Sequence, residues 1–211
     1  MNELKIINIY KNFGKKEVLK DISLDVCGGQ IVGLVGENGC GKTVLMKIII
    51  GLMKASKGEV IYNGKQLKTD MDYLDSVGFI IENPSFFGEL SGYENLKLLA
   101  DIKKKIGDKE ILSWLEKVGL KDISYKVDDY SLGMKQRLTL AQALMEDEEV
   151  LILDEPTNSL DEEGVELFHS LLKQQKEKRK IIIISSHNKY DIEQLADEVY
   201  RIKEGKMYRE K

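Results

Sequence analysis

The sequence is poor in cysteine, lacks a long hydrophobic run and carries no excess of positive charge. Its two cysteines, Cys27 and Cys40, are too few for a disulfide framework in a chain of 211 residues. The longest apolar runs, such as KIIIISSH, are too short to span a bilayer, and the first residues do not resemble a secretory leader. The net charge of −4 gives no long-range positive field that would attract phosphate backbones. We therefore expect a cytoplasmic protein that does not bind nucleic acid and that could act at a membrane only through a partner chain.

Short runs rich in β-branched residues alternate with helical patterns along most of the chain. Three runs, IVGLVG, VLILDE and IIIISS, are almost continuously apolar, which is typical of central strands that are covered on both faces. Because helical segments lie between them, the predicted class is α/β with a mainly parallel sheet. The length is sufficient for one core with an inserted subdomain.

Two segments depart from this alternation. Residues 2–30 are expected to form short strands joined by glycine-containing and charged turns, as in an antiparallel β flap. From Glu89 to about Ala143 the chain has apolar residues at three- and four-residue spacing, which indicates helices. We therefore predict one domain over residues 1–211, with the α/β core and its flap in residues 1–82 and 140–211 and the helical subdomain in residues 83–139.

A glycine-rich loop follows the first central strand. Residues 36–43, GENGCGKT, fit the pattern G-x-x-x-x-G-K-[ST] at every fixed position, between a strand and an amphipathic segment. Glycines let successive N–H groups point at a phosphate, and the helix N-terminus beyond them adds partial positive charge. A plain glycine turn is the alternative. The residues predicted to contact the nucleotide are Gly36, Asn38, Gly39, Cys40, Gly41, Lys42, Thr43 and Val44.

Polar residues also follow two further strands. Asp154 and Glu155 end VLILDE, where Asp154 is expected to join the Thr43 hydroxyl in holding Mg²⁺ and Glu155 to polarise an attacking water. An ordinary turn is the alternative, although adjacent acids at a buried strand end are costly without a cation. His187 ends IIIISSH, at the edge where parallel sheets bind ligands. Alone it would be read as a core histidine. Together, these motifs predict a site for ATP and Mg²⁺, with Lys42 reaching the β- and γ-phosphates.

These motifs resemble, in order and spacing, the nucleotide-binding subunit of an ATP-binding cassette (ABC) transporter over essentially the whole chain. Residues 130–137, YSLGMKQR, stand at the place of the family's LSGGQ signature, and Ser131 and Gly133 match its serine and second glycine. Residues 158–161, NSLD, resemble the D-loop. The resemblance implies the ABC ATPase fold, a P-loop NTPase core with a β flap and an inserted helical subdomain.

The resemblance also implies roles for individual residues. His187 matches the switch histidine, and Phe13 in YKNFG matches the aromatic residue that stacks on adenine, with packing of the flap on the core as the alternative. Two cassettes would associate head to tail, so that Ser131 and the Gly133 N–H of one close over the ATP of the other. Glu155 would act as the general base, while Lys42 and His187 would stabilise the transition state. The dimer would drive separate permease chains from the inner face of the cell membrane.

Three residues depart from the family pattern. Glu82 stands where the family has the Q-loop glutamine; its carboxylate could still ligand Mg²⁺, but its charge is expected to slow turnover or to shift metal preference. Leu132 replaces the first glycine of the signature, so close backbone approach is less favourable there. Met134 replaces the signature glutamine and removes one polar contact.

The segments around these departures resemble exporters of the bacitracin-resistance and lantibiotic self-immunity type, which implies export of a peptide antibiotic. Residues 83–96, NPSFFGELSGYENL, are the expected docking segment for a permease helix, with Phe86 and Phe87 as exposed aromatics in the groove or, alternatively, as local packing residues. Two other functions stay open: a non-transport ABC ATPase acting on ribosomes or DNA, disfavoured because the chain has one cassette and no sustained heptads, and a binding module without catalysis.

Overall fold

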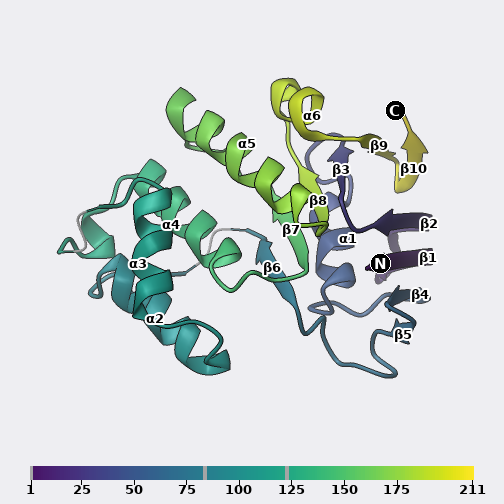
Figure 1. Ribbon diagram of the computed structural model, residues 1–211. Coiled ribbons are helices and arrows are strands. Elements are labelled where there is room, and N and C mark those ends of the chain that lie inside the picture. Colours follow the sequence, from purple (N-terminus) through teal and green to yellow (C-terminus); the bar gives the residue numbers. More distant parts are fainter. Residues whose placement is uncertain (1, 83–84, 122–123) are drawn as a thin grey trace.

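A computed structural model describes residues 2–82, 85–121 and 124–211 of the chain, and it contains two sheets and a group of helices (Figure 1). The first sheet is antiparallel, with the strands in the order β2 (Lys16–Cys27), β1 (Glu3–Phe13), β4 (Lys57–Tyr62) and β5 (Lys65–Gln66). The second has the order β10 (Lys206–Arg209), β9 (Glu198–Lys203), β3 (Gln30–Val35), β8 (Ile181–Ser185), β7 (Val150–Asp154) and β6 (Val77–Ile80). All neighbours in the second sheet are parallel except β10 and β9. The predicted fold, a mainly parallel sheet with an antiparallel N-terminal flap, is confirmed.

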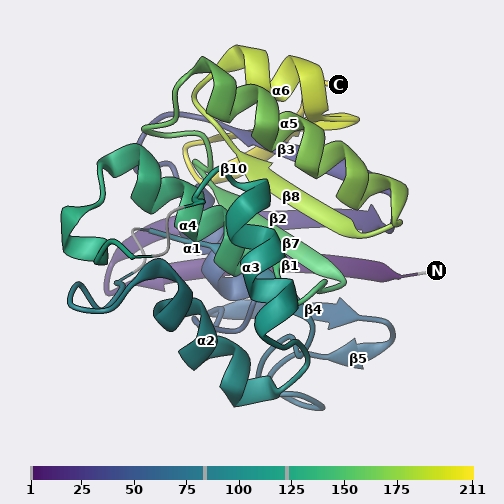
Figure 2. The same ribbon diagram turned by 60° about the vertical axis from the view of Figure 1, so that its left-hand side comes forward.

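The helices pack on both faces of the parallel sheet. In chain order they are α1 (Lys42–Ile49), α2 (Gly92–Lys103), α3 (Asp108–Lys117), the 3-10 turn η1 (Val127–Asp129), α4 (Leu132–Leu144), α5 (Glu162–Glu177) and α6 (Lys189–Leu195). Helix α1 lies between the two sheets, whereas α5 and α6 cover the opposite face of the parallel sheet (Figures 1 and 2). Helices α2, α3 and α4 gather beyond β6, at the end of the molecule away from the flap.

The continuous apolar runs are explained by two hydrophobic clusters that share the central strands. In β7, Val150 and Ile152 face α1 and the flap, while Leu151 and Leu153 face the helices on the other side. All four side chains are fully buried. Successive side chains of a strand point to opposite faces, so a strand covered on both faces has no position left for a polar residue.

Helix α4 connects the helical group to the sheet. It begins at the signature segment and continues to Leu144, so the predicted subdomain boundary between residues 139 and 140 falls inside one helix. Its last turn packs closely on β6, because a Cβ on Gly78 would lie 1.9 Å from the carbonyl oxygen of Ala143. One helix therefore joins the signature segment to the edge strand of the parallel sheet.

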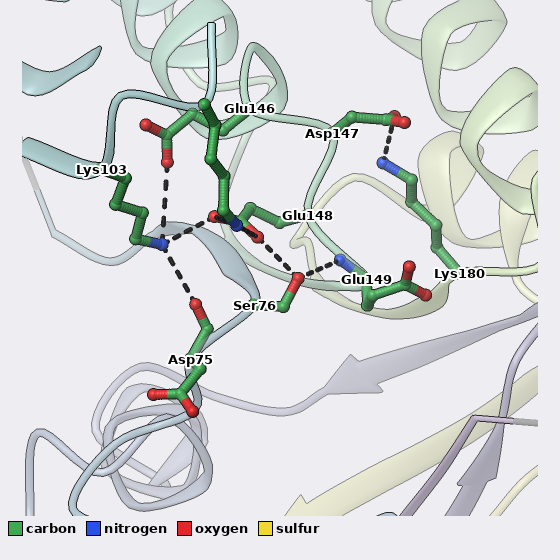
Figure 3. Close-up of polar contacts among 9 residues, drawn as sticks. Asp75, Ser76, Lys103, Glu146, Asp147, Glu148, Glu149 and Lys180 are labelled. Atoms are coloured by element: carbon green, nitrogen blue, oxygen red, sulfur yellow. Dashed lines mark hydrogen bonds and ion pairs between the residues drawn. The ribbon is translucent and has the colours of Figure 1, made fainter. Parts of the chain in front are cut away.

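A buried ionic cluster links the helical group to the edge of the sheet from which β6 and β7 begin (Figure 3). Glu148, just before β7, is 3% exposed and accepts hydrogen bonds from Lys103 at the end of α2, from Lys105 and from Ser76 before β6. Burial opposes ionisation of Glu148, but these hydrogen bonds outweigh it and hold the pKa of this carboxyl below its ordinary value. Glu148 is therefore ionised at neutral pH.

We predict that Glu148→Gln lowers the free energy of unfolding at pH 7 by about 1–3 kcal/mol, because the hydrogen bonds from two cations are weakened while both lysines can still reach water. A carboxyl with a lowered pKa stabilises the fold above its ordinary pKa and loses that contribution as the pH falls through its folded value. The difference between wild type and Glu148→Gln in urea unfolding should therefore shrink below about pH 4.5. Glu116→Gln, on the exposed face of α3, is the matched control and should be neutral; an equal loss in both variants would contradict the prediction.

Candidate functional site

The predicted site residues meet at the carboxyl ends of β3, β7 and β8. A cavity of 280 Å³ lies there, and it is lined by Asn38, Gly39, Gly41, Lys42, Thr43, Val44, Asp154, Glu155, Asn158 and His187. Residues that are more than 140 positions apart in the sequence are therefore brought to one surface. The lining includes most of the predicted nucleotide contacts and all three predicted catalytic residues.

The glycine loop adopts a backbone that other residues would not tolerate. Gly41, the residue before α1, has a left-handed φ of 114°, and a Cβ at Gly36 would lie 2.4 Å from the carbonyl oxygen of Ile202. Gly36 and Cys40 do not line the cavity. Cys40 instead packs against the hydrophobic cluster between the two sheets. The cavity is thus bounded by backbone and by the N-terminus of α1, an arrangement suited to phosphate.

Lys42 is a buried cation that is held only by neutral groups. Its side chain is 6% exposed, and Nζ donates to the carbonyl oxygens of Gly36 at 2.8 Å and Glu37 at 3.4 Å. None of the carboxylates in the described ranges forms an ion pair with it. Because carbonyl oxygens satisfy the N–H groups but do not neutralise the charge, Lys42 remains available to an anion in the cavity.

Thr43 and Asp154 form the candidate metal centre. The Thr43 hydroxyl donates to one carboxylate oxygen of Asp154, and the Ser185 hydroxyl donates to the other. In nucleotide sites Mg²⁺ is bound by a few protein oxygens together with phosphate oxygens and water. The hydroxyl of Thr43 and the carboxylate of Asp154 are oxygen ligands of this kind, so the residues present fit the ion. Ser185 was not predicted. Its position at the end of an apolar strand, β8, could have indicated it. In the structure it pairs in register with Asp154 of β7.

Glu155 and His187 face each other at the cavity. The backbone N–H of His187 donates to Glu155 Oε2 at 3.2 Å, and His187 Nε2 lies 3.2 Å from Glu155 Oε1 without forming a hydrogen bond. Within the described part of the chain, Oε1 is a buried acceptor with no hydrogen-bond partner. A buried acceptor of this kind is costly unless a donor arrives, and a water in the cavity would supply one.

Glu82 lies outside this arrangement. It has a left-handed φ of 61°, and its carboxylate pairs with Lys47 of α1 at 2.6 Å. Glu82 does not line the cavity that contains Thr43 and Asp154, and its place among the metal ligands stays a prediction.

The signature segment contacts the loop that follows Glu155 and does not line the cavity. Ser131 caps α4 by accepting a hydrogen bond from the backbone N–H of Met134 at 3.2 Å. Gln136 donates to the carbonyl oxygen of Pro156 at 2.7 Å, and Arg137 pairs with Asp161 at 2.8 Å. The neighbouring Leu132 is 74% exposed and Gly133 packs near the Ser159 carbonyl. Ser131, Leu132 and Gly133 do not line the cavity of their own chain.

Comparison with known proteins decides the family. The family model described as ABC transporter matches residues 19–158. The chain belongs to the ABC transporter family. This cassette is 38% identical over 209 residues to the lantibiotic transport ATP-binding protein SrtF of Streptococcus pyogenes, covering 99% of this chain and 90% of SrtF. It is 43% identical over 206 residues to the bacitracin transport ATP-binding protein BcrA of Enterococcus faecalis, covering 96% of this chain and 67% of BcrA.

Solved structures agree with this assignment. The dimeric structure of MJ0796, a bacterial ABC transporter cassette, matches with a TM-score of 0.88 and 25% identity, covering 99% of this cassette and 98% of that chain. The predicted resemblance and the predicted ATP-binding subunit of an ABC transporter are thus confirmed, and nothing supports the alternative of a ribosome- or DNA-acting ATPase. Among the described helices of the cassette, none is long and apolar enough to cross a membrane.

Phe13 lies at the end of β1, beside the hairpin that joins it to β2. The ring is 49% exposed and belongs to neither hydrophobic cluster, which disfavours the alternative that it fastens the flap to the core. Lys11 Nζ lies 4.9 Å from the ring centre and so takes one face of the ring. A planar base could stack on the remaining face.

A second cavity, of 240 Å³, opens between β6, α2 and α4 of the cassette and includes both predicted docking aromatics. Phe87 is 67% exposed, as expected. Phe86 is partly buried and packs against a hydrophobic cluster, so the alternative of local packing holds for this residue. Asn95 of α2 fixes the turn by accepting from the Phe87 N–H and donating to the Phe87 carbonyl oxygen. Asn83 and Pro84, the first residues of the predicted docking segment, lie outside the described residues.

Proposed function

We propose that this cassette binds and hydrolyses MgATP as a head-to-tail pair and thereby drives a separate permease that exports a peptide antibiotic. The observation that carries the proposal is the convergence of Lys42, Thr43, Asp154, Glu155 and His187 on one cavity. A loop that binds phosphate, a metal donor set and an unsatisfied carboxylate next to a histidine together meet the chemical requirements of phosphoryl transfer to water.

In the proposed reaction each residue has a physical role. Lys42 and the loop N–H groups bind the phosphates, and Thr43 and Asp154 hold Mg²⁺, which neutralises charge on the β- and γ-phosphates. Glu155 Oε1 accepts a proton from the attacking water, and His187 beside it stabilises the charge that develops on the γ-phosphate. Phe13 stacks on the adenine. Glu82 could add an oxygen to the metal only after leaving Lys47, so this ion pair competes with the metal for it.

The second copy completes the site in this proposal. Because Ser131 and Gly133 stand at the N-terminus of α4 and away from their own cavity, they would reach the γ-phosphate of the partner cassette. ATP would then hold two chains together, and hydrolysis would release them. The dimeric MJ0796 structure supports a pair, and the printed functions of SrtF and BcrA support a lantibiotic or bacitracin-like peptide as cargo.

The permease would contact the groove that contains Phe87, on the cytoplasmic face of the membrane. Phe87 is a large exposed apolar side chain on a backbone held by two hydrogen bonds to Asn95, so little entropy would be lost when a permease helix covers it. The groove lies at the end of β6 and beside α4, which links it to both the sheet and the signature segment.

Co-expression with the permease tests this proposal. Cells that carry the cassette and its permease should tolerate peptide antibiotics at concentrations several-fold higher than cells that lack the cassette. Phe87→Ala should remove most of this protection and weaken co-purification with the permease by about 10-fold or more, the usual cost of losing a central apolar anchor. It should leave the ATPase activity of the isolated cassette unchanged.

The matched control is Tyr208→Ala, which removes an exposed aromatic from β10. Protection that survives Phe87→Ala, or that is lost equally in Tyr208→Ala, would contradict the assigned docking surface. If the cells gain no protection against any peptide antibiotic while the cassette still hydrolyses ATP, the proposed cargo is wrong and the proposed ATPase activity stands.

A further inference from the structure

Asp191 in α6 is a buried carboxylate that does not line the nucleotide cavity. It is 1% exposed and accepts three hydrogen bonds, from the Thr157 hydroxyl at 2.6 Å, from His169 Nε2 at 2.7 Å and from the Ser186 hydroxyl at 2.9 Å. The Thr157 and Ser186 hydroxyls both donate to Oδ2, whereas His169 Nε2 meets Oδ1. Among the described residues no lysine or arginine pairs with Asp191.

The three donors come from the segments that carry the catalytic residues. Thr157 follows Glu155 by two positions, on the loop after β7. Ser186 is the residue before His187, on the loop after β8, and its hydroxyl also accepts the backbone N–H of Asn188 at 3.0 Å. One carboxylate therefore joins the loop of Glu155 to the loop of His187.

His169 fixes this carboxylate to a rigid element. It lies on α5, is 3% exposed and meets Asp191 Oδ1 through Nε2. The ring of Tyr190 lies 5.4 Å from the His169 ring, and the Tyr190 hydroxyl donates to Glu166 of the same helix at 2.9 Å. Helices α5 and α6 are thus connected around Asp191 by the contacts of His169 and Tyr190.

The catalytic pair depends on the relative position of these two loops. Glu155 has a left-handed φ of 49°, and its Oε2 is met by the His187 backbone N–H at 3.2 Å. That hydrogen bond spans the two loops at the cavity, while Asp191 spans them again below it. Because catalysis is sensitive to displacements of about 1 Å, a second connection between the loops has a direct kinetic consequence.

We propose that Asp191 is a positioning residue: through Thr157 and Ser186 it holds the loops of Glu155 and His187 at the separation that ATP hydrolysis requires. This inference rests on the proposed hydrolysis of ATP and adds residues to it. His169 supports Asp191 from α5. None of these four residues lines the nucleotide cavity, so we expect ATP binding to change little when they are replaced.

Asp191→Asn, which keeps the shape of the side chain, tests this. The kcat for ATP should fall by roughly 10- to 100-fold, as for a misplaced catalytic group, while the Kd for ATP changes by less than about 3-fold. Thr157→Val and Ser186→Ala should each lower kcat by a smaller factor, and adding either to Asp191→Asn should produce little further loss, because all act through one carboxylate. Glu148→Gln, which alters an equally buried carboxylate far from the loops, should lower stability without lowering kcat.

A second readout is independent of activity. In the nucleotide-free protein, Asp191→Asn should raise the hydrogen-exchange rates of the amides of residues 155–159 and 186–188 by about 10-fold, with the amides of β3 unchanged. If the wild type hydrolyses ATP but Asp191→Asn has the same kcat and the same exchange rates as wild type, the inference is overturned and the proposed function stands. A wild type that hydrolyses no ATP would overturn the proposed function itself, and the exchange result would still decide whether Asp191 orders the two loops.

Discussion

Replacing Glu155 by glutamine is expected to lower the kcat for ATP by about 100- to 10,000-fold while ATP remains bound, the range that a general base contributes. The amide keeps the size of the side chain and one oxygen that can accept the His187 backbone N–H, so the loop geometry should survive. What is lost is the basic Oε1 atom, which is buried and unsatisfied in the structure. The variant should therefore bind ATP but be unable to take the proton from water.

Two measurements check this expectation. Steady-state phosphate release gives kcat, and size-exclusion chromatography with MgATP should show the glutamine variant as a dimer, because the nucleotide that holds the pair together is not consumed. Glu37→Gln is the control, because Glu37 is an exposed acid in the glycine loop that does not line the cavity. Wild-type turnover in Glu155→Gln would remove Glu155 from its role. Equal losses in both variants would point to a general effect of charge near the phosphates.

Replacing Lys42 by alanine is expected to weaken ATP binding by at least about 30-fold. Truncating one partner of a buried charged pair costs about 2 kcal/mol or more, and here the phosphates would lose the one lysine or arginine that lines their cavity among the described residues. The residue is 6% exposed and paired with no carboxylate among the described residues, so its charge is not compensated by the protein.

Equilibrium dialysis or fluorescence titration with ATP and with ADP measures this effect. Lys42 also donates a hydrogen bond to the Gly36 carbonyl oxygen, so its loss could destabilise the fold. The thermal unfolding of the nucleotide-free variant is therefore compared with that of wild type, to separate a loss of affinity from a loss of stability. Lys109→Ala, on the exposed surface of α3, is the control and should bind ATP as wild type does. Retention of wild-type ATP affinity by Lys42→Ala would refute the proposed site.

The parts of the fold that were predictable are those encoded by neighbours in the sequence. The strand β7 was recognisable because Val150 to Leu153 are all apolar, and a strand covered on both faces requires that pattern. The glycine loop was recognisable because a phosphate-binding turn needs glycine at fixed spacings and a lysine and hydroxyl at its end. In both cases the physical requirement acts within about ten consecutive residues.

The surroundings that the sequence left open depend on partners far along the chain. The exposure of Phe86 and Phe87 differs because Asn95, eight residues after Phe87, turns the backbone between them. Glu82 is drawn to Lys47, which the position of α1 brings close. Ser185 and Asp191 have ordinary surroundings in the sequence, and only the parallel pairing of β7 with β8 places them beside Asp154 and Thr157.

By itself, the sequence determined the family, the sheet-forming runs and the glycine loop proposed to bind phosphate, because these depend on local patterns of apolar, glycine and charged residues. Only the tertiary structure decided that Glu155 Oε1 is unsatisfied and faces His187 and that one buried carboxylate ties the two catalytic loops together. It alone also showed that the signature residues Ser131 and Gly133 do not line the cavity of their own chain. The reason is that distances and unmet hydrogen bonds arise between segments separated by tens of residues, and no local pattern in a chain encodes them.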